Sequence, residues 1–86
     1  MKRDPYLVRA VVHSALVLSA FDGEGQALSL RCIAERSGLS KTMTYRQLYT
    51  LERCGLVERV ARTLYRLCGR HPCRRRDAAE LLALVS

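Results

Sequence analysis

Two short segments with helical periodicity, residues 30–37 and 41–54, are joined by only three residues. The first of these, Gly38, tolerates the positive φ that ends a helix, and the last, Ser40, is a residue type that caps a new one. So short a connection places the two helices against each other and requires a small residue where they cross, which Ala34 supplies. This stretch predicts two helices that cross at a steep angle, and it limits the fold more than any other part of the sequence.

A first helix is predicted over residues 6–21, because Asp4 can cap it and Pro5 suits its first turn. The glycine-containing segment 22–27 ends this helix, and Ser29 caps the helix that follows. Apolar residues of the first helix recur about every 3.6 positions, so we expect them to face the core. They are Val8, Val11, Val12, Ala15, Leu16 and Phe21.

The hydrophobic period changes from 3.6 to two after the third helix. Alternating apolar and polar residues at 56–60 and 64–67 predict a β-hairpin with the short link 61–63. Val57 and Val60 fall on opposite faces of such a strand, which leaves its register open. The predicted fold is therefore mostly α with a small β-hairpin, a three-helix core plus a wing: a winged helix-turn-helix.

We expect a single domain over residues 1–86, with its core at 6–67 and a basic loop and C-terminal helix at 68–86. The final helix is predicted over 78–85, after a loop at 69–76. Its apolar stripe can cover the chain's own core or pair with a second copy. The stripe consists of Leu81, Leu82 and Val85.

Charge indicates the class of partner. The net charge is +7, and 13 of the 15 basic residues are arginine, whose planar guanidinium pairs bidentately with phosphate and guanine. Residues 41–76 hold ten basic side chains against two acidic ones, so the positive charge gathers in the second half of the chain. A basic face on a helix-turn-helix predicts double-stranded DNA as the partner.

Helical spacing divides the third helix into two faces. Thr44, Leu48 and Leu51 fall on one side and are expected in the core, which turns the opposite side toward the DNA. The predicted contacts of this helix are Ser40, Lys41, Thr42, Met43, Tyr45, Arg46, Tyr49 and Arg53. Those of the wing, at the DNA backbone or minor groove, are Arg59, Arg62, Thr63 and Arg66. A solvated basic face is the plainer alternative.

The stretch "LSLRCIAERSGLSKTMTYRQLYTLERCGLVERV" followed by "LYRL" resembles the winged helix-turn-helix domain of IclR-type bacterial transcription regulators, and less closely that of MarR-type ones. The resemblance implies a DNA-reading turn at Lys41, Thr42, Met43, Tyr45 and Arg46 and a wing at 59–66. Thr44 and Gln47 depart from it, because the family usually has apolar core residues there. The family's large effector-binding domain is absent, which fits either a fragment or a complete small regulator, and we expect no small-molecule effector site.

The cysteines raise the question of a metal site. Cys68, His71 and Cys73 lie close in sequence and, with Cys32 or Cys54, offer four zinc ligands. The spacing is not CxxC, however, and Cys32 and Cys54 fall on separate helices as small buried hydrophobes. We therefore expect reduced thiols, no metal and no cofactor.

The remaining alternatives concern the class of protein. Pro72-Cys73-Arg74 resembles part of the Pro-Cys-His-Arg nucleophile motif of alkylguanine DNA alkyltransferases, but the histidine is out of order and no activating base is evident, so we expect no enzyme. No window approaches the roughly 18 apolar residues of a membrane span, which favours a cytoplasmic protein. We expect a homodimer formed through either the first or the last helix. The rival functions are a protein-interaction module and a nonspecific architectural DNA binder.

Overall fold

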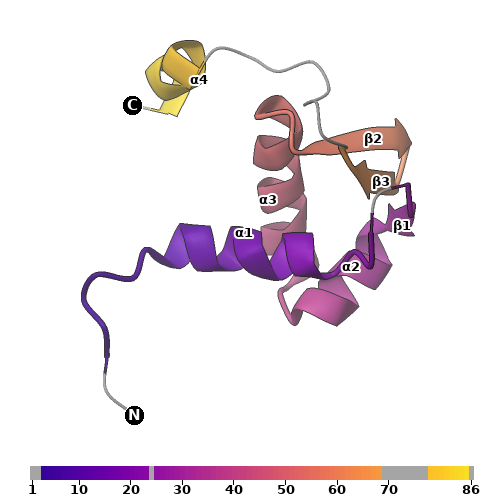
Figure 1. Ribbon diagram of the computed structural model, residues 1–86, viewed down its shortest axis with the longest axis horizontal. Helices are drawn as coiled ribbons and strands as arrows, with labels where there is room; N and C mark the ends of the chain where they lie inside the picture. Colours follow the sequence, from indigo (N-terminus) through magenta and orange to yellow (C-terminus); the bar gives the residue numbers. More distant parts are fainter. Residues whose placement is uncertain (1–2, 24, 69–77, 86) are drawn as a thin grey trace.

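The computed structural model describes residues 3–23, 25–68 and 78–85. Figure 1 shows α3 standing across α1, with α2 beside the crossing and the sheet to one side. In chain order the elements are α1 (Arg9–Ser19), β1 (Leu28–Ser29), α2 (Leu30–Ser37), α3 (Lys41–Arg53), β2 (Val57–Ala61), β3 (Leu64–Leu67) and α4 (Ala78–Val85). This arrangement confirms the winged helix. The predicted loop at 69–76 lies outside the described residues.

The connection between α2 and α3 has the geometry that the sequence predicts. The Ser29 hydroxyl accepts a hydrogen bond from the backbone N–H of Cys32 at 3.1 Å, and the Ser40 hydroxyl accepts one from that of Met43 at 3.1 Å. Gly38 has φ +79°, and its N–H donates to the Ala34 carbonyl at 3.0 Å. Both helices are therefore capped by the residues expected to cap them.

The core is formed where α1, α2, α3 and the sheet meet. Its most completely buried apolar side chains come one from each: Val17, Ile33, Leu48 and Val57. Around them lie Ala20, Phe21, Leu28, Leu51 and Tyr65, with Leu39 of the interhelical turn partly buried against the cluster. Thr44, Leu48 and Leu51 all face inward, as predicted.

The predicted core face of α1 is wrong. Helix α1 begins at Arg9 rather than at residue 6, because the Asp4 carboxylate accepts a hydrogen bond from the Tyr6 N–H in a preceding turn. Only the C-terminal part of α1 reaches the body, and its N-terminal part projects past α3 (Figure 1). The residues that pack are therefore Val17, Ala20 and, just after the helix, Phe21. Phe21 is in the core as predicted. The other residues that helical spacing predicts for the core are exposed: Val8, Val11, Val12, Ala15 and Leu16.

The sheet contains one strand that the sequence analysis did not find. The two residues of β1 pair antiparallel with β3, so the strand order is β1-β3-β2. Strands β2 and β3 form the predicted hairpin, with an irregularity between Arg59 and Ala61 that inserts Val60. Val57 is buried and Val60 is exposed, so the two valines do not share a face. The Leu30 N–H donates to the Thr63 carbonyl at 3.0 Å, which ties the hairpin turn to the start of α2.

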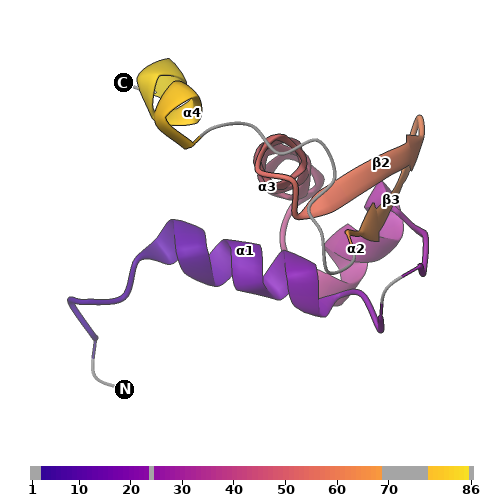
Figure 2. The same cartoon turned by 45° about the horizontal axis from the view of Figure 1, so that its top comes forward.

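Helix α4 has the predicted bounds but does not cover the core of its own chain. It lies apart from the three-helix body in both orientations (Figures 1 and 2). Leu82 and Val85 of its apolar stripe are 69% and 78% exposed. Of the two roles considered for this stripe, covering the monomer's core is therefore wrong.

Gly38→Ala should lower the free energy of unfolding by about 1–2 kcal/mol, because an L-residue with a side chain resists a positive φ. A Cβ at this position meets no atom within 4 Å, so the cost is conformational rather than steric. Gly23→Ala is the matched control, since Gly23 also has open space around it and does not have a positive φ. Denaturant unfolding of both variants checks the prediction, and equal stabilities would contradict it.

Thr44→Val should raise the free energy of unfolding by about 1 kcal/mol, because the change removes a buried hydroxyl that has no hydrogen-bond partner. Thr44 is fully buried, and its Oγ1 is unpaired. Thr50→Val, on the exposed side of the same helix, is the control and should change stability by less than about 0.5 kcal/mol. A destabilised Thr44→Val protein in the same unfolding assay would show that the hydroxyl is satisfied.

Candidate nucleic-acid interface

The outer face of α3 is set by what its inner face buries. Successive helical residues are 100° apart, so the burial of Thr44, Leu48 and Leu51 turns the opposite side of the helix outward. The exposed candidates on α3 and its cap are Ser40, Lys41, Thr42, Tyr45, Arg46 and Tyr49, while Met43 and Arg53 are half-buried. The structure therefore gathers all the helix residues singled out from the sequence at one side of α3 and its N-terminal turn.

The basic side chains on this face differ in whether they already have a partner within the chain. Within the ranges that the structure describes, the side chains of Lys41 and Arg46 take part in no ion pair or hydrogen bond. Arg53 is engaged: its Nη1 lies 3.6 Å from Glu52 Oε1, and its guanidinium carbon lies 4.2 Å from the centre of the Tyr49 ring. Lys41 and Arg46 are thus the charges of α3 that are free to meet an anion.

An open groove of about 380 Å³ separates the N-terminal half of α1 from α3. It is lined by Arg9, Ala10, His13, Met43, Arg46, Gln47 and Thr50. Among the described residues, the lining holds two arginines and no carboxylate. At its floor the Ser14 hydroxyl donates to Gln47 Oε1 at 2.7 Å, which explains how a polar residue is accommodated at a position where an apolar one was expected.

Sequence reasoning missed the contribution of α1 to this groove. Arg9 and His13 are four residues apart, so they lie one helical turn from each other on the same side of α1. That spacing was a usable signal, but the opposite face of α1 had been assigned to the core. With α1 in its observed orientation, Arg9 joins Arg46 at the groove.

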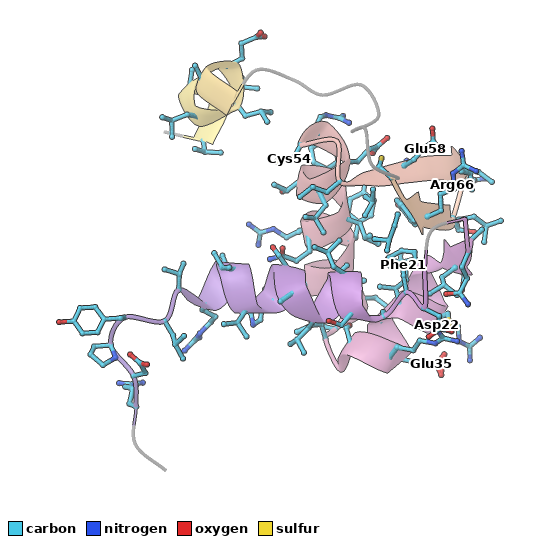
Figure 3. The ribbon with its side chains drawn as sticks, in the orientation of Figure 1. Phe21, Asp22, Glu35, Cys54, Glu58 and Arg66 are labelled. Carbon is cyan, nitrogen blue, oxygen red and sulfur yellow. The ribbon has the colours of Figure 1, made fainter. Side chains whose placement is uncertain are left out.

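The wing arginines are largely engaged within the sheet. Glu58 and Arg66 are opposite each other on β2 and β3, and Arg66 Nε donates to Glu58 Oε1 at 2.6 Å (Figure 3). Arg59 Nε donates to the Arg62 carbonyl at 2.9 Å, and its guanidinium lies 5.8 Å from the Tyr65 ring centre. The side chain of Arg62, in the hairpin turn, is exposed and has no partner in the described part of the chain.

Tyr65 links the wing to the core. Burial raises the pKa of its phenol above the ordinary value of 10.0, and the nearby Arg59 guanidinium opposes that rise to a smaller extent. The phenol is neutral at pH 7, as an unburied tyrosine also is, and the raised pKa extends that neutral range to higher pH.

The other candidate sites are the possible metal site and the motif around Cys73. Cys32, Cys54 and Cys68 are free thiols. Among residues 3–23, 25–68 and 78–85 there is no group of three or more histidine, cysteine or acidic side chains arranged to hold a metal ion. His71 and Cys73 lie outside those residues, as does the motif around Cys73. None of the helices in the described ranges is long and apolar enough to span a membrane.

A comparison with protein families gives a match to this chain. The IclR helix-turn-helix domain matches residues 10–61, which run from α1 through the helix-turn-helix to the end of β2. No match was found among curated proteins. The matched span includes the whole outer face of α3 and the groove residues from Ala10 onward.

Proposed function

Since the chain belongs to the IclR helix-turn-helix domain family, a family of DNA-binding transcription regulator domains, we propose that it recognises a specific duplex sequence with α3 in the major groove. The observation that carries this proposal is the outer face of α3, where Lys41 and Arg46 are exposed and, among the described residues, unpaired beside hydroxyl and aromatic side chains. Those groups suit both phosphate contact and base reading. The proposed role is regulation of transcription in the cytoplasm, without catalysis.

The two ends of the face serve different contacts. The N-terminal turn of α3 carries Lys41 and Thr42, whose ammonium and hydroxyl groups suit phosphates and base edges at the point where the helix enters the groove. Arg46 lies one turn further on, and its guanidinium can donate two hydrogen bonds to the O6 and N7 atoms of guanine. Arg9, which lines the same groove as Arg46, adds a further cation that has no ion-pair partner in the described part of the chain.

The hairpin is proposed to contact the DNA backbone or minor groove through its turn. Arg62 and Thr63 are exposed there, whereas Arg66 is neutralised by Glu58. The Thr63 carbonyl is bonded to α2, so the turn is held against the helix-turn-helix rather than extending freely. The wing therefore adds one free arginine to the proposed interface, although the sequence offers three.

The rival classes fit the same surface less well. A protein-interaction module should present apolar side chains on the outer face of α3, but its exposed residues are charged, hydroxylated or tyrosine. A nonspecific architectural binder needs only phosphate contacts, and it does not explain an unpaired arginine in the middle of the major-groove face. Enrichment of one motif from a random duplex pool separates specific from nonspecific binding.

Arg46→Ala should weaken binding to the selected duplex by about 1–3 kcal/mol and relax base preference, because it removes a base-reading guanidinium. Arg62→Ala should weaken selected and scrambled duplexes alike and lower the salt slope by about one, because it removes a phosphate contact. Fluorescence anisotropy across a salt series measures both effects.

The matched control is the double variant Glu58→Gln and Arg66→Gln, which removes an ion pair without changing the net charge. It should bind both duplexes within about twofold of the unaltered protein, because exposed ion pairs contribute little. Equal losses for Arg46→Ala on selected and scrambled DNA would contradict base reading. A loss in the control as large as that of Arg62→Ala would show that Arg66 leaves Glu58 to contact DNA.

The exposed face of α1 favours assembly into a homodimer, which we propose as the DNA-binding form. Apolar side chains along one side of α1 and the turn before it have no cover from the chain's own core. They are Leu7, Val8, Val11, Val12 and Leu16. A two-fold dimer through this side buries them and presents two copies of α3 to successive major grooves, which lie about 34 Å apart along DNA.

Val11→Glu should convert the homodimer to a monomer, because the carboxylate enters the proposed apolar interface at a residue that is 64% exposed in the single chain. Val60→Glu is the control, since Val60 is an exposed valine of the hairpin. Sedimentation velocity without DNA gives the mass of each protein. A monomeric unaltered protein, or a Val11→Glu protein that stays dimeric, would contradict this interface.

A further inference from the structure

A shallow hollow lies on the outer face of α3, one turn beyond its N-terminal end. Its volume is about 290 Å³, and it is lined by Tyr45, Arg46, Tyr49 and Thr50. The two tyrosine rings have their centres 6.2 Å apart and are inclined at 45°, so they meet at an angle rather than stacking flat. Tyr45 and Tyr49 are 42% and 47% exposed, which leaves apolar ring surface open to a partner.

Arg53 lies over the Tyr49 ring. Its guanidinium carbon is 4.2 Å from the ring centre, within the range of a cation–π interaction. Glu52 Oε1 in turn lies 3.6 Å from Arg53 Nη1. These two contacts favour a role for Arg53 in positioning the Tyr49 ring, while its direct contact with DNA stays a prediction.

The remaining walls of the hollow are also largely apolar. The Thr50 hydroxyl donates to the Arg46 carbonyl at 3.0 Å, so its hydrogen is used within the helix and the methyl group is the free part of the side chain. Arg46 also lines the hollow, and its side chain offers a methylene stem as well as a charged end. The hollow therefore combines two aromatic rings, a methylene chain and a methyl group beside a cation.

Among the groups that base pairs display in the major groove, the C5-methyl of thymine is the apolar one. We propose that this hollow receives the C5-methyl group of a thymine, so that Tyr45 and Tyr49 determine sequence preference and Arg53 positions Tyr49 for that contact. The inference rests on the proposed function, since it requires α3 in the major groove. It adds a thymine contact to the guanine contact assigned to Arg46.

The test uses the full chain and the duplex enriched from a random pool. Each thymine of the enriched motif is replaced in turn by deoxyuridine, which lacks only the C5-methyl group. At the contacted thymine the affinity should fall about fourfold, the value expected for one buried methyl group. Replacement by 5-bromodeoxyuridine should restore the affinity, because bromine is close to methyl in size and cannot donate a hydrogen bond.

Four protein variants test whether the hollow causes this loss of affinity. For each variant, the measured quantity is the ratio of its affinity for the thymine duplex to its affinity for the uracil duplex. Tyr49→Phe keeps the ring and should keep the ratio, whereas Tyr49→Gln should bring it close to one. Arg53→Gln should reduce the ratio without removing it, because the ring remains but is no longer fixed. Tyr6→Gln is the control, since Tyr6 is an exposed tyrosine outside α3, and it should leave the ratio unchanged.

Two results overturn the inference while leaving the proposed function intact. One is an enriched motif in which no thymine-to-uracil replacement lowers affinity, and the other is a Tyr49→Gln protein that retains the full ratio. A third result, binding to duplex DNA without enrichment of any motif, overturns sequence recognition itself and the hollow's role with it. A ratio that depends on Tyr49 and is reduced by Arg53→Gln supports both assignments.

Discussion

The left-handed turn at Gly38 is the constraint on which the interface depends. Its φ of +79° ends α2 and starts α3 within three residues, so the direction of α3 relative to α2 is determined locally. Once α3 has that direction, Leu48 and Thr44 point into the core and the opposite side must face solvent. The surface proposed to face DNA is thus a consequence of a backbone conformation together with the burial of three side chains.

Net charge describes the proposed interface poorly, because many of its cations are already engaged. Arg66 is paired with Glu58, Arg59 with a carbonyl of the hairpin turn, and Arg53 with Glu52 and an aromatic ring. These arginines shape the surface that Lys41 and Arg46 present, rather than adding freely to its potential. Specific recognition benefits from such fixed groups, because less side-chain entropy is lost when the partner binds.

Sequence reasoning was correct for features that interactions within a few residues determine, and it was wrong where the packing of distant segments determines the structure. Serine caps, a positive-φ glycine and helical spacing placed α2 and α3 correctly, because each signal acts within a few residues. Helix α1 carries apolar residues on two sides, and periodicity alone cannot tell which one meets the body, so Val17 was passed over in favour of Val11 and its neighbours. Likewise the Glu58–Arg66 pair follows from strand register, and the hollow at Tyr45 and Tyr49 follows from ring orientations, which no residue spacing encodes.

Helix α1 carries both the proposed assembly surface and the proposed DNA contact on one element. Arg9 and His13 line the groove beside Arg46, while Val8, Val12 and Leu16 lie exposed on another side of the same helix. The Ser14–Gln47 hydrogen bond and the bond from Arg36 to the Ala20 carbonyl, at 2.9 Å, fasten α1 to α3 and α2. A second copy docked on the apolar side of α1 would therefore determine where both copies of α3 lie. In such a dimer, the spacing of the two half-sites in DNA depends on how the α1 helices pack and not on a flexible linker.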